Sequence, residues 1–175
     1  LALHGGETLL VNGAGGITGG LIVQLAAQRG VDVLATASPR SADRVRGHGA
    51  REVIDYRDPM WPQHVTALAM GSIDAVANAA PGGAAAAMTA LADGGRLATI
   101  TPDSPASARG ITVTAVYVRS DGAQLDRLTA LLASHRLCMP IPRSCSLDQA
   151  ASALAQVVAG HESSGVVIAK DISRS

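Results

Sequence analysis

The stretch LLVNGAGGITGG, residues 9–20, joins an apolar run directly to a cluster of glycines. A cluster of this kind either holds the phosphates of a nucleotide or is only a tight turn, and this chain has 19 glycines in 175 residues. The context separates the two interpretations, because a dinucleotide site needs a strand before the glycines and a helix after them. Residues 8–12 are typical of a buried strand and residues 16–29 of an amphipathic helix. The sequence therefore favours a phosphate-binding turn, with the simple turn as the alternative.

The spacing of the glycines gives each of them a distinct expected role. Gly13, Gly16 and Gly19 recur every third residue, while Thr18 stands where a strict GxGxxG pattern would end. A side chain at Gly13 or Gly16 would block the approach of backbone N–H groups to a pyrophosphate, and Gly19 would let the helix lie near the strand. We expect the positive end of the helix to face the phosphates.

The end of the next expected strand indicates which nucleotide is preferred. An NAD site places Asp or Glu there to bind the ribose 2′-hydroxyl, but this sequence reads ATASPR at residues 35–40. Asp32 lies at the opposite end of the strand. Ser38 and Arg40 supply a hydroxyl and a guanidinium, which suit a 2′-phosphate, so NADP(H) is favoured over NAD(H). The alternative is that Ser38 only caps a helix and Arg40 is a solvated helix residue.

Apolar strand patterns alternate with helical patterns along most of the chain, with no internal repeat. Strands are expected at residues 8–12, 31–36, 52–54, 73–78, 96–100 and 111–118, and helices at 16–29, from 38, at 81–91 and at 123–135. This alternation predicts an α/β fold with a doubly wound parallel sheet. In the first helix, the expected apolar face comprises Ile17, Leu21, Ile22, Leu25 and Ala26.

The end of the chain breaks this alternation. Residues 146–149 form a capping box before a helix through about residue 159, and residues 165–169 are a final strand pattern. Neither continues the sequence of strand and helix, so we expect them to pack on something other than the main sheet. The predicted organisation is a cofactor-binding domain at 1–136 and a helix and strand extension at 137–175.

Composition excludes several classes of function. Fourteen basic and fourteen acidic residues give a net charge of zero, which makes nucleic acid or an anionic membrane an unexpected partner. No apolar stretch reaches the roughly 18 residues of a membrane helix and no signal peptide is recognisable, so a cytoplasmic protein is expected. Two cysteines and five scattered histidines have no metal-ligand spacing. We expect no metal site, and two small buried or half-buried thiols.

Blocks spread over nearly the whole chain keep the order and spacing of a known family. They are GETLLVNGAGGITGGLIVQLAAQRGVDVLATASPR (6–40), GHGAREVIDYRD (47–58), IDAVANAAPGG (73–83), GGRLATI (94–100) and SLDQAASALAQVVAGHESSGVVIA (146–169). Together they resemble the cofactor-binding half of the medium-chain dehydrogenases/reductases, in particular the zinc-free quinone oxidoreductase branch. Ile17 departs from a frequent glycine of that family. Because the loop binds phosphate through backbone N–H groups, Ile17 and Thr18 can still serve.

The resemblance implies further site residues. Tyr56 matches a tyrosine that reaches the 2′-phosphate in similar proteins; its alternative role is packing at a strand end. Asn78, Ala79 and Ala80 match a segment that passes the cofactor ribose and nicotinamide, and Ile100 matches a point where the backbone approaches the cofactor. The expected cofactor site comprises Gly13, Gly16, Ile17, Thr18, Gly19, Ser38, Arg40, Tyr56, Asn78, Ala79, Ala80 and Ile100.

Family members place a catalytic domain before this half, and no such domain lies within these residues. The resemblance thus implies the NADP(H)-binding part of an oxidoreductase that reduces a quinone or an enone, with its catalytic domain supplied in cis or in trans. The alternative is a noncatalytic NADP(H)-binding module, a sensor or a subunit. The β-branched segment at 111–118 is expected at a sheet edge, where the family often forms homodimers.

Overall fold

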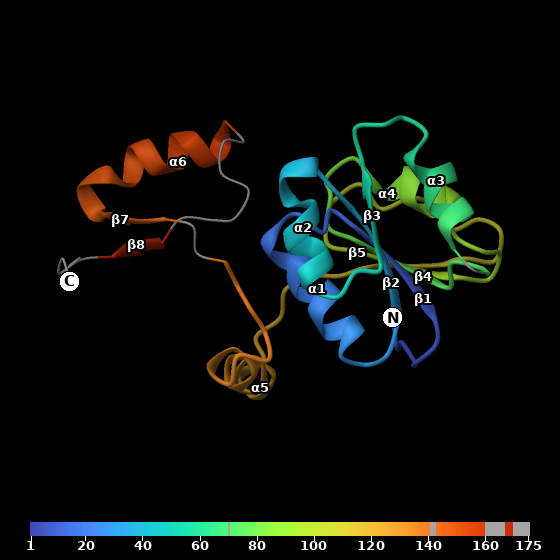
Figure 1. The fold of residues 1–175 in the computed structure, drawn as a ribbon, viewed down its shortest axis with the longest axis horizontal. Coiled ribbons are helices and arrows are strands. Elements are labelled where there is room, and N and C mark those ends of the chain that lie inside the picture. Colours follow the sequence, from blue (N-terminus) through green and yellow to red (C-terminus); the bar gives the residue numbers. More distant parts are fainter. Residues whose placement is uncertain (70, 141–142, 160–166, 170–175) are drawn as a thin grey trace.

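Six parallel strands form the central sheet of the computed structural model, which describes residues 1–69, 71–140, 143–159 and 167–169 (Figure 1). The strand order is β3-β2-β1-β4-β5-β6. The strands are β1 (Thr8–Asn12), β2 (Asp32–Ala37), β3 (Glu52–Asp55), β4 (Ala75–Asn78), β5 (Arg96–Thr99) and β6 (Thr112–Ala115). From β1 the chain adds strands outward to β3, then returns to β4 on the other side of β1. This reversal confirms the doubly wound fold and creates a switch point at the carboxyl ends of β1 and β4, where such folds bind ligands.

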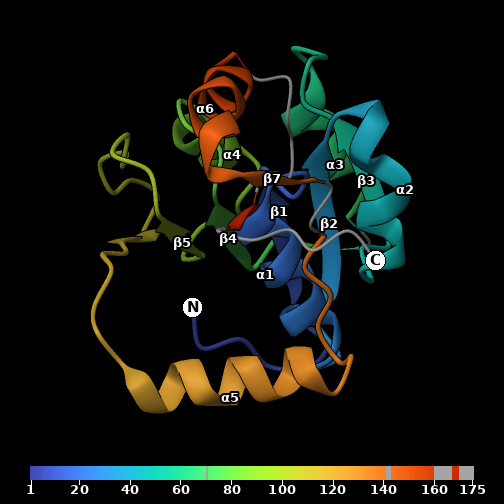
Figure 2. The same cartoon turned by 90° about the vertical axis from the view of Figure 1, so that its left-hand side faces the viewer.

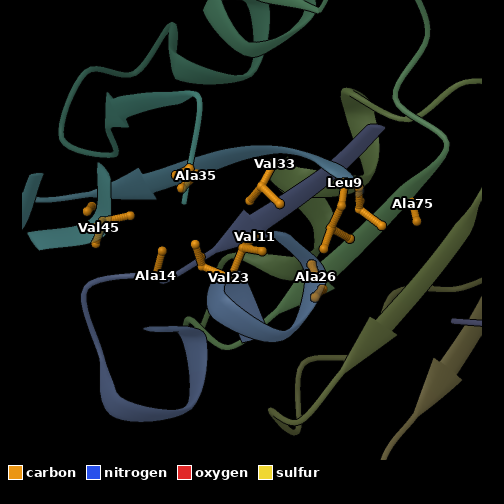
Figure 3. Close-up of a cluster of buried hydrophobic side chains, with 13 residues drawn as sticks. Leu9, Val11, Ala14, Val23, Ala26, Val33, Ala35, Val45 and Ala75 are labelled. Carbon is orange, nitrogen blue, oxygen red and sulfur yellow. The ribbon is translucent and has the colours of Figure 1, made fainter. Parts of the chain in front are cut away.

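Helices cover both faces of the sheet, and alternate residues of each strand face opposite layers. The connecting helices are α1 (Ile17–Ala27), α2 (Pro39–Gly47), α3 (Trp61–Leu68) and α4 (Ala84–Thr89). Leu9 and Val11 pack with Val23 of α1 and Val45 of α2, as Figure 3 shows. Leu10, between them in sequence, joins the cluster on the α3 and α4 side. Both faces of β1 are therefore buried, which explains its uninterrupted apolar run.

The buried face of α1 differs from the expected one. Its buried residues are Gly19, Gly20, Val23, Gln24 and Ala26, so only Ala26 of the predicted apolar face is fully buried. The reason is the close approach of the helix to the sheet, because a Cβ built on Gly19 would lie 2.2 Å from the Gly13 carbonyl oxygen. Small residues permit that approach, whereas the larger Leu21, Ile22 and Leu25 remain half-buried.

Other elements differ in extent from the sequence expectation. Helix α3 was not expected, because it is only eight residues long and begins at a Trp-Pro pair. Its buried residues include Trp61 and Val65. Strand β6 ends at Ala115 rather than at 118, and Val118 is fully exposed. Beyond Ala115 the chain leaves the sheet edge. The edge position expected for this strand is confirmed.

The last third of the chain lies apart from the main sheet (Figures 1 and 2). It contains α5 (Gly122–Ala133), β7 (Ser144–Ser146), a 3-10 turn (Leu147–Gln149), α6 (Ala150–Val158) and β8 (Val167–Ala169), and β7 pairs with β8 in a separate two-stranded parallel sheet. The expected capping box at 146–149 does not form, since Ser146 makes no side-chain capping bond. Residues 165 and 166 of the expected final strand lie outside the described residues. The domain boundary after residue 136 stays a prediction.

Two remaining expectations concern the thiols and membranes. Both cysteines are free, and Cys145 is buried, but Cys138 is exposed. The backbone of Cys138 binds a side chain of α1. Its N–H donates to Gln24 Oε1 at 2.7 Å, and its carbonyl oxygen accepts from Gln24 Nε2 at 2.9 Å. These bonds attach the start of the C-terminal region to α1. Among the helices described, none has the length and apolar character needed to cross a membrane.

Candidate functional site

The glycine turn after β1 is held in a conformation that few other residues could adopt. Gly13 has φ +87°, and a Cβ there would lie 2.9 Å from the backbone nitrogen of Ala80. Its N–H donates to Thr36 Oγ1 at 3.0 Å, and the Ala14 N–H donates to the Thr36 carbonyl oxygen at 2.9 Å. The turn is thus fastened to the end of β2 on one side and packed against the segment after β4 on the other.

Helix α1 begins directly after this turn with no side chain at its N-terminus. Gly16 is the N-cap residue, and neither a side-chain cap nor an acidic residue satisfies the first turn. The N–H groups of Ile17 and Thr18 belong to this first turn, which has no intrahelical partners. A Cβ on Gly16 would meet no atom closer than 3.6 Å, so packing does not demand a glycine here. The N-terminus presents unsatisfied donors and a partial positive charge, as an anion site requires.

A cavity of about 280 Å³ lies beside the turn and brings together residues predicted from three separate segments. Ser38, Arg40 and Tyr56 line it together with Gly13 and Gly16. Ser38 occupies the N-cap position of α2 without making a capping bond, and its hydroxyl donates instead to Ser41 Oγ at 3.4 Å. The guanidinium of Arg40 forms no ion pair with any described residue. The wall of the cavity is therefore cationic and rich in donors.

A second arginine supports the turn from behind. Arg44 Nη2 donates to the Gly15 carbonyl oxygen at 2.8 Å and lies 3.5 Å from Ser41 Oγ. This bond holds the Gly15 carbonyl oxygen towards α2, while the N–H groups of Gly13, Ala14 and Gly16 are bonded to Thr36 or within the turn. Sequence reasoning missed Arg44, because one helical turn after Arg40 it resembled an ordinary solvated residue.

A larger and more apolar cavity of about 440 Å³ adjoins the first one. The two cavities share Gly13, Thr36 and Tyr56, and the larger one adds Trp61 and Ala80. Trp61 is the only tryptophan of the chain. Its place in the site could not be foreseen, because it comes from the unexpected helix α3.

The remaining predicted residues lie at the carboxyl ends of β4 and β5. Ile100 is 46% exposed and lines a third cavity of about 250 Å³ together with Thr101 and Tyr117. Asn78 is 1% exposed, and its amide is engaged by neighbouring protein groups rather than directed at an open cavity. The Ala79 N–H donates to the Asn12 carbonyl oxygen at 2.8 Å. All these residues thus gather at one edge of the sheet.

Sequence reasoning also missed polar residues at the strand ends. Thr36 and Asn12 are 0% and 2% exposed, and each lines a cavity of the site. A signal was present, because Asn12 and Thr36 are polar residues placed near the ends of two otherwise apolar strands. Burying them requires hydrogen-bond partners, which only the neighbouring strands can provide.

The fold is a Rossmann-like α/β domain, and the candidate site lies at the switch point of its sheet. The cradle next to Gly16, the uncapped start of α1 and the cationic wall at Ser38 and Arg40 fit the phosphates of a dinucleotide. In the part of the chain that the structure describes, no three His, Cys, Asp or Glu side chains gather as metal ligands.

The comparisons with known proteins narrow the class to a family. The family profile described as zinc-binding dehydrogenase matches residues 48–168, which is more than half of the chain. The chain belongs to this family, within the medium-chain dehydrogenases/reductases. The match starts after the glycine turn, so it is independent of the geometry of that turn.

Curated relatives align over part of the chain. A trans-enoyl reductase of Alternaria alternata, ACTTS2, is 38% identical over 89 residues, which are 51% of this chain and 26% of that protein. A trans-enoyl reductase of Pyricularia oryzae, RAP2, is 41% identical over 59 residues, 34% of this chain and 17% of that protein. The aligned segments therefore span about a quarter or less of these relatives.

Solved structures share the fold over nearly the whole chain. A quinone oxidoreductase from Coxiella burnetii has a TM-score of 0.81 at 23% identity, covering 94% of this chain and 53% of that chain. An NAD-dependent alcohol dehydrogenase has a TM-score of 0.85 at 22% identity, covering 98% of this chain and 53% of that chain. A mycobacterial protein, Rv1454c, whose structure is complexed with NADPH, has a TM-score of 0.78 at 22% identity, covering 95% of this chain and 57% of that chain. The chain corresponds to about half the length of these neighbours.

Proposed function

We propose that this chain is the cofactor-binding part of an oxidoreductase that transfers hydride between NADP(H) and a quinone or an enone. The observation that carries the proposal is the cavity beside the glycine turn. There Ser38 and Arg40 follow a strand that ends without a carboxylate, and Tyr56 completes the wall. This chemistry favours a 2′-phosphate over a ribose hydroxyl.

Each residue group has a place in this proposal. The N–H groups of the first turn of α1, at Ile17, Thr18 and Gly19, hold the pyrophosphate beside Gly13 and Gly16. Arg40 with Ser38 holds the 2′-phosphate. The apolar cavity lined by Trp61 takes the adenine ring, since flat aromatic walls suit a nucleobase. Ala79, Ala80 and Ile100 contact the ribose and nicotinamide end.

The acceptor class rests on the relatives. Two curated relatives are named trans-enoyl reductases, and one solved neighbour is named a quinone oxidoreductase. The bound nicotinamide would supply the hydride chemistry, while this chain binds and orients the cofactor. We propose that a second domain, in cis or in trans, supplies the substrate wall and the catalytic side chains.

Cofactor titration tests the proposal. The emission of Trp61 reports binding because this residue lines the cavity adjoining the first. We expect the chain to bind NADPH more tightly than NADH, and Arg40→Ala to raise the Kd for NADPH about tenfold or more while leaving that for NADH unchanged. Arg46→Ala is the matched control, since it removes an equal charge from the same helix at a residue paired with Asp43.

Equal affinity of the unaltered chain for NADPH and NADH would contradict the preference for NADP(H). Oxidation of NADPH in the presence of a simple quinone, measured on the chain alone and with its catalytic domain, separates the enzyme from a noncatalytic binding module. The module is supported if the complete protein binds NADPH and never oxidises it with any quinone or enone.

A further inference from the structure

A row of buried polar side chains crosses the carboxyl edge of the sheet beneath the proposed cofactor site. Asn12, Asn78 and Thr99 are register partners on β1, β4 and β5, so their side chains share one face. Thr36 extends the row to β2. The four residues are between 0% and 2% exposed, although each carries a polar group. Burial of this kind is stable only when every polar group has a partner.

Hydrogen bonds connect the row without interruption. The Thr36 hydroxyl donates to Asn12 Oδ1 at 2.6 Å, and Asn12 Nδ2 donates to Asn78 Oδ1 at 2.8 Å. Asn78 Nδ2 then donates to Thr99 Oγ1 at 3.0 Å and to Thr101 Oγ1 at 2.8 Å. The donors therefore point in one direction, from β2 towards the loop after β5.

The two ends of the row lie in different cavities. At the first end, Thr36 Oγ1 accepts the Gly13 N–H and lines the cavity with Arg40. At the other end, Thr101 lines the cavity with Ile100, which has no lining residue in common with the first. The loop at this end is itself anchored, because Asp103 Oδ2 accepts the Ala84 N–H at 3.1 Å. The Thr101 hydroxyl and this N–H lower the pKa of Asp103, so its carboxyl stays charged.

We infer that this row is a positioning network that couples the glycine turn to the loop after β5, so that ligand binding beside Arg40 depends on the hydroxyl of Thr101. The inference rests on the proposed function for the class of ligand. Loss of the Thr101 hydroxyl leaves Asn78 with a weaker set of acceptors, and the change passes through Asn12 to Thr36 and the Gly13 N–H. Thr101 is a positioning residue for a phosphate site that it does not line.

The probe for this coupling is adenosine 2′,5′-bisphosphate, which carries the 2′-phosphate and the adenine but no nicotinamide. We expect Thr101→Val to weaken its binding about fivefold or more by calorimetry, and Thr36→Val to weaken it as well. Thr101→Ser, which keeps the hydroxyl, should restore the affinity. The matched control is Thr129→Val, at an exposed threonine of α5 outside the row.

Two further measurements separate coupling from a purely structural role. If the row couples its two ends, the double variant of Thr36→Val and Thr101→Val loses an amount of binding free energy that differs from the sum of the two single losses. In addition, Thr101→Val shifts the amide proton resonance of Gly13 in the ligand-free chain. A lower urea midpoint for Thr101→Val with unchanged affinity and an unchanged Gly13 resonance would overturn the inference. If the unaltered chain fails to bind the bisphosphate, the proposed function fails first, and the inference falls with it.

Discussion

Glycines of the same turn serve different physical purposes. Gly13 needs its positive φ, and Gly19 needs the absence of a Cβ because the Gly13 carbonyl oxygen would lie 2.2 Å from it. Gly16 has ordinary extended backbone angles and open space around its Cβ position. Packing therefore explains the first two glycines. Packing does not require the third, Gly16, and we propose that it leaves room for the phosphates of the cofactor.

This difference gives a prediction for two substitutions. Gly16→Val should abolish NADPH binding and leave the free energy of unfolding nearly unchanged, because its side chain fills only the proposed phosphate position. Gly19→Ala should lower the free energy of unfolding by about 1–3 kcal/mol, because it overpacks α1 against the turn. Cofactor titration and urea unfolding of both variants test the pair. Retained NADPH binding by folded Gly16→Val would mean that the glycine cluster is only a turn.

At the scale of elements, the contact between α1 and α2 contains a half-buried titratable group. His48, the C-cap residue of α2, has its Nδ1 buried without a hydrogen-bond partner among the described residues, and it would lie 3.3 Å from a Cβ on Gly20 of α1. Burial, and secondly the positive charge of Arg44, lower the pKa of His48 below its ordinary value of 6.5. The imidazole is accordingly neutral in the folded chain near neutral pH.

Stability should therefore depend on this histidine in a defined pH window. Between the lowered folded pKa and 6.5, the unfolded chain binds the proton more readily, so the contribution present above pH 6.5 is lost as the pH falls. We expect the free energy of unfolding to decrease less between pH 7.5 and about pH 5.5 in His48→Gln than in the unaltered chain. Urea titrations at both pH values measure the difference. An identical decrease in both proteins would show that His48 does not contribute.

At the scale of the whole molecule, the main sheet has two ends of different character. Among the described strands, β3 pairs with β2 alone and β6 with β5 alone, but β3 is also contacted by α2 and α3. Exposed apolar side chains follow β6, with Tyr117 84% exposed. An uncovered edge strand next to apolar surface favours pairing with another chain.

We predict that the chain forms a homodimer through the segment at 111–118. Light scattering over a range of concentrations should give a dimer mass. Ala115→Pro should shift the mass towards the monomer, because the N–H groups of Thr112 and Val116 donate to carbonyl oxygens on the β5 side and the alternating N–H of Ala115 therefore faces the free edge. The control is Thr129→Ala, because it lies on the exposed helix α5, outside this segment. Thr18→Pro would not serve as a control, because it would alter α1. A monomer at high concentration for the unaltered chain would contradict the prediction.

Much of the fold could be predicted because it depends on local patterns. The apolar runs of β1 and β2, the glycines of the turn and the proline at the start of α2 carry their structure in neighbouring residues. Helix α3 was missed because its apolar face is short and its stability comes from Trp61 packing against the sheet. The apolar face predicted for α1 was wrong, because the close approach of the helix to the glycine turn buries Gly19 and Gly20 together with Val23 and Gln24.

The sequence by itself determined the order of the elements, the glycine turn and the absence of an acid at the end of β2, since all of these are properties of consecutive residues. Only the tertiary structure decided which distant side chains share a cavity. It placed Tyr56 beside Arg40 in one cavity and Trp61 in the adjoining cavity, set Arg44 behind the turn, and aligned Asn12 with Asn78. The physical reason is that strand order and register come from packing of the whole sheet, and these bring together residues that no local pattern relates.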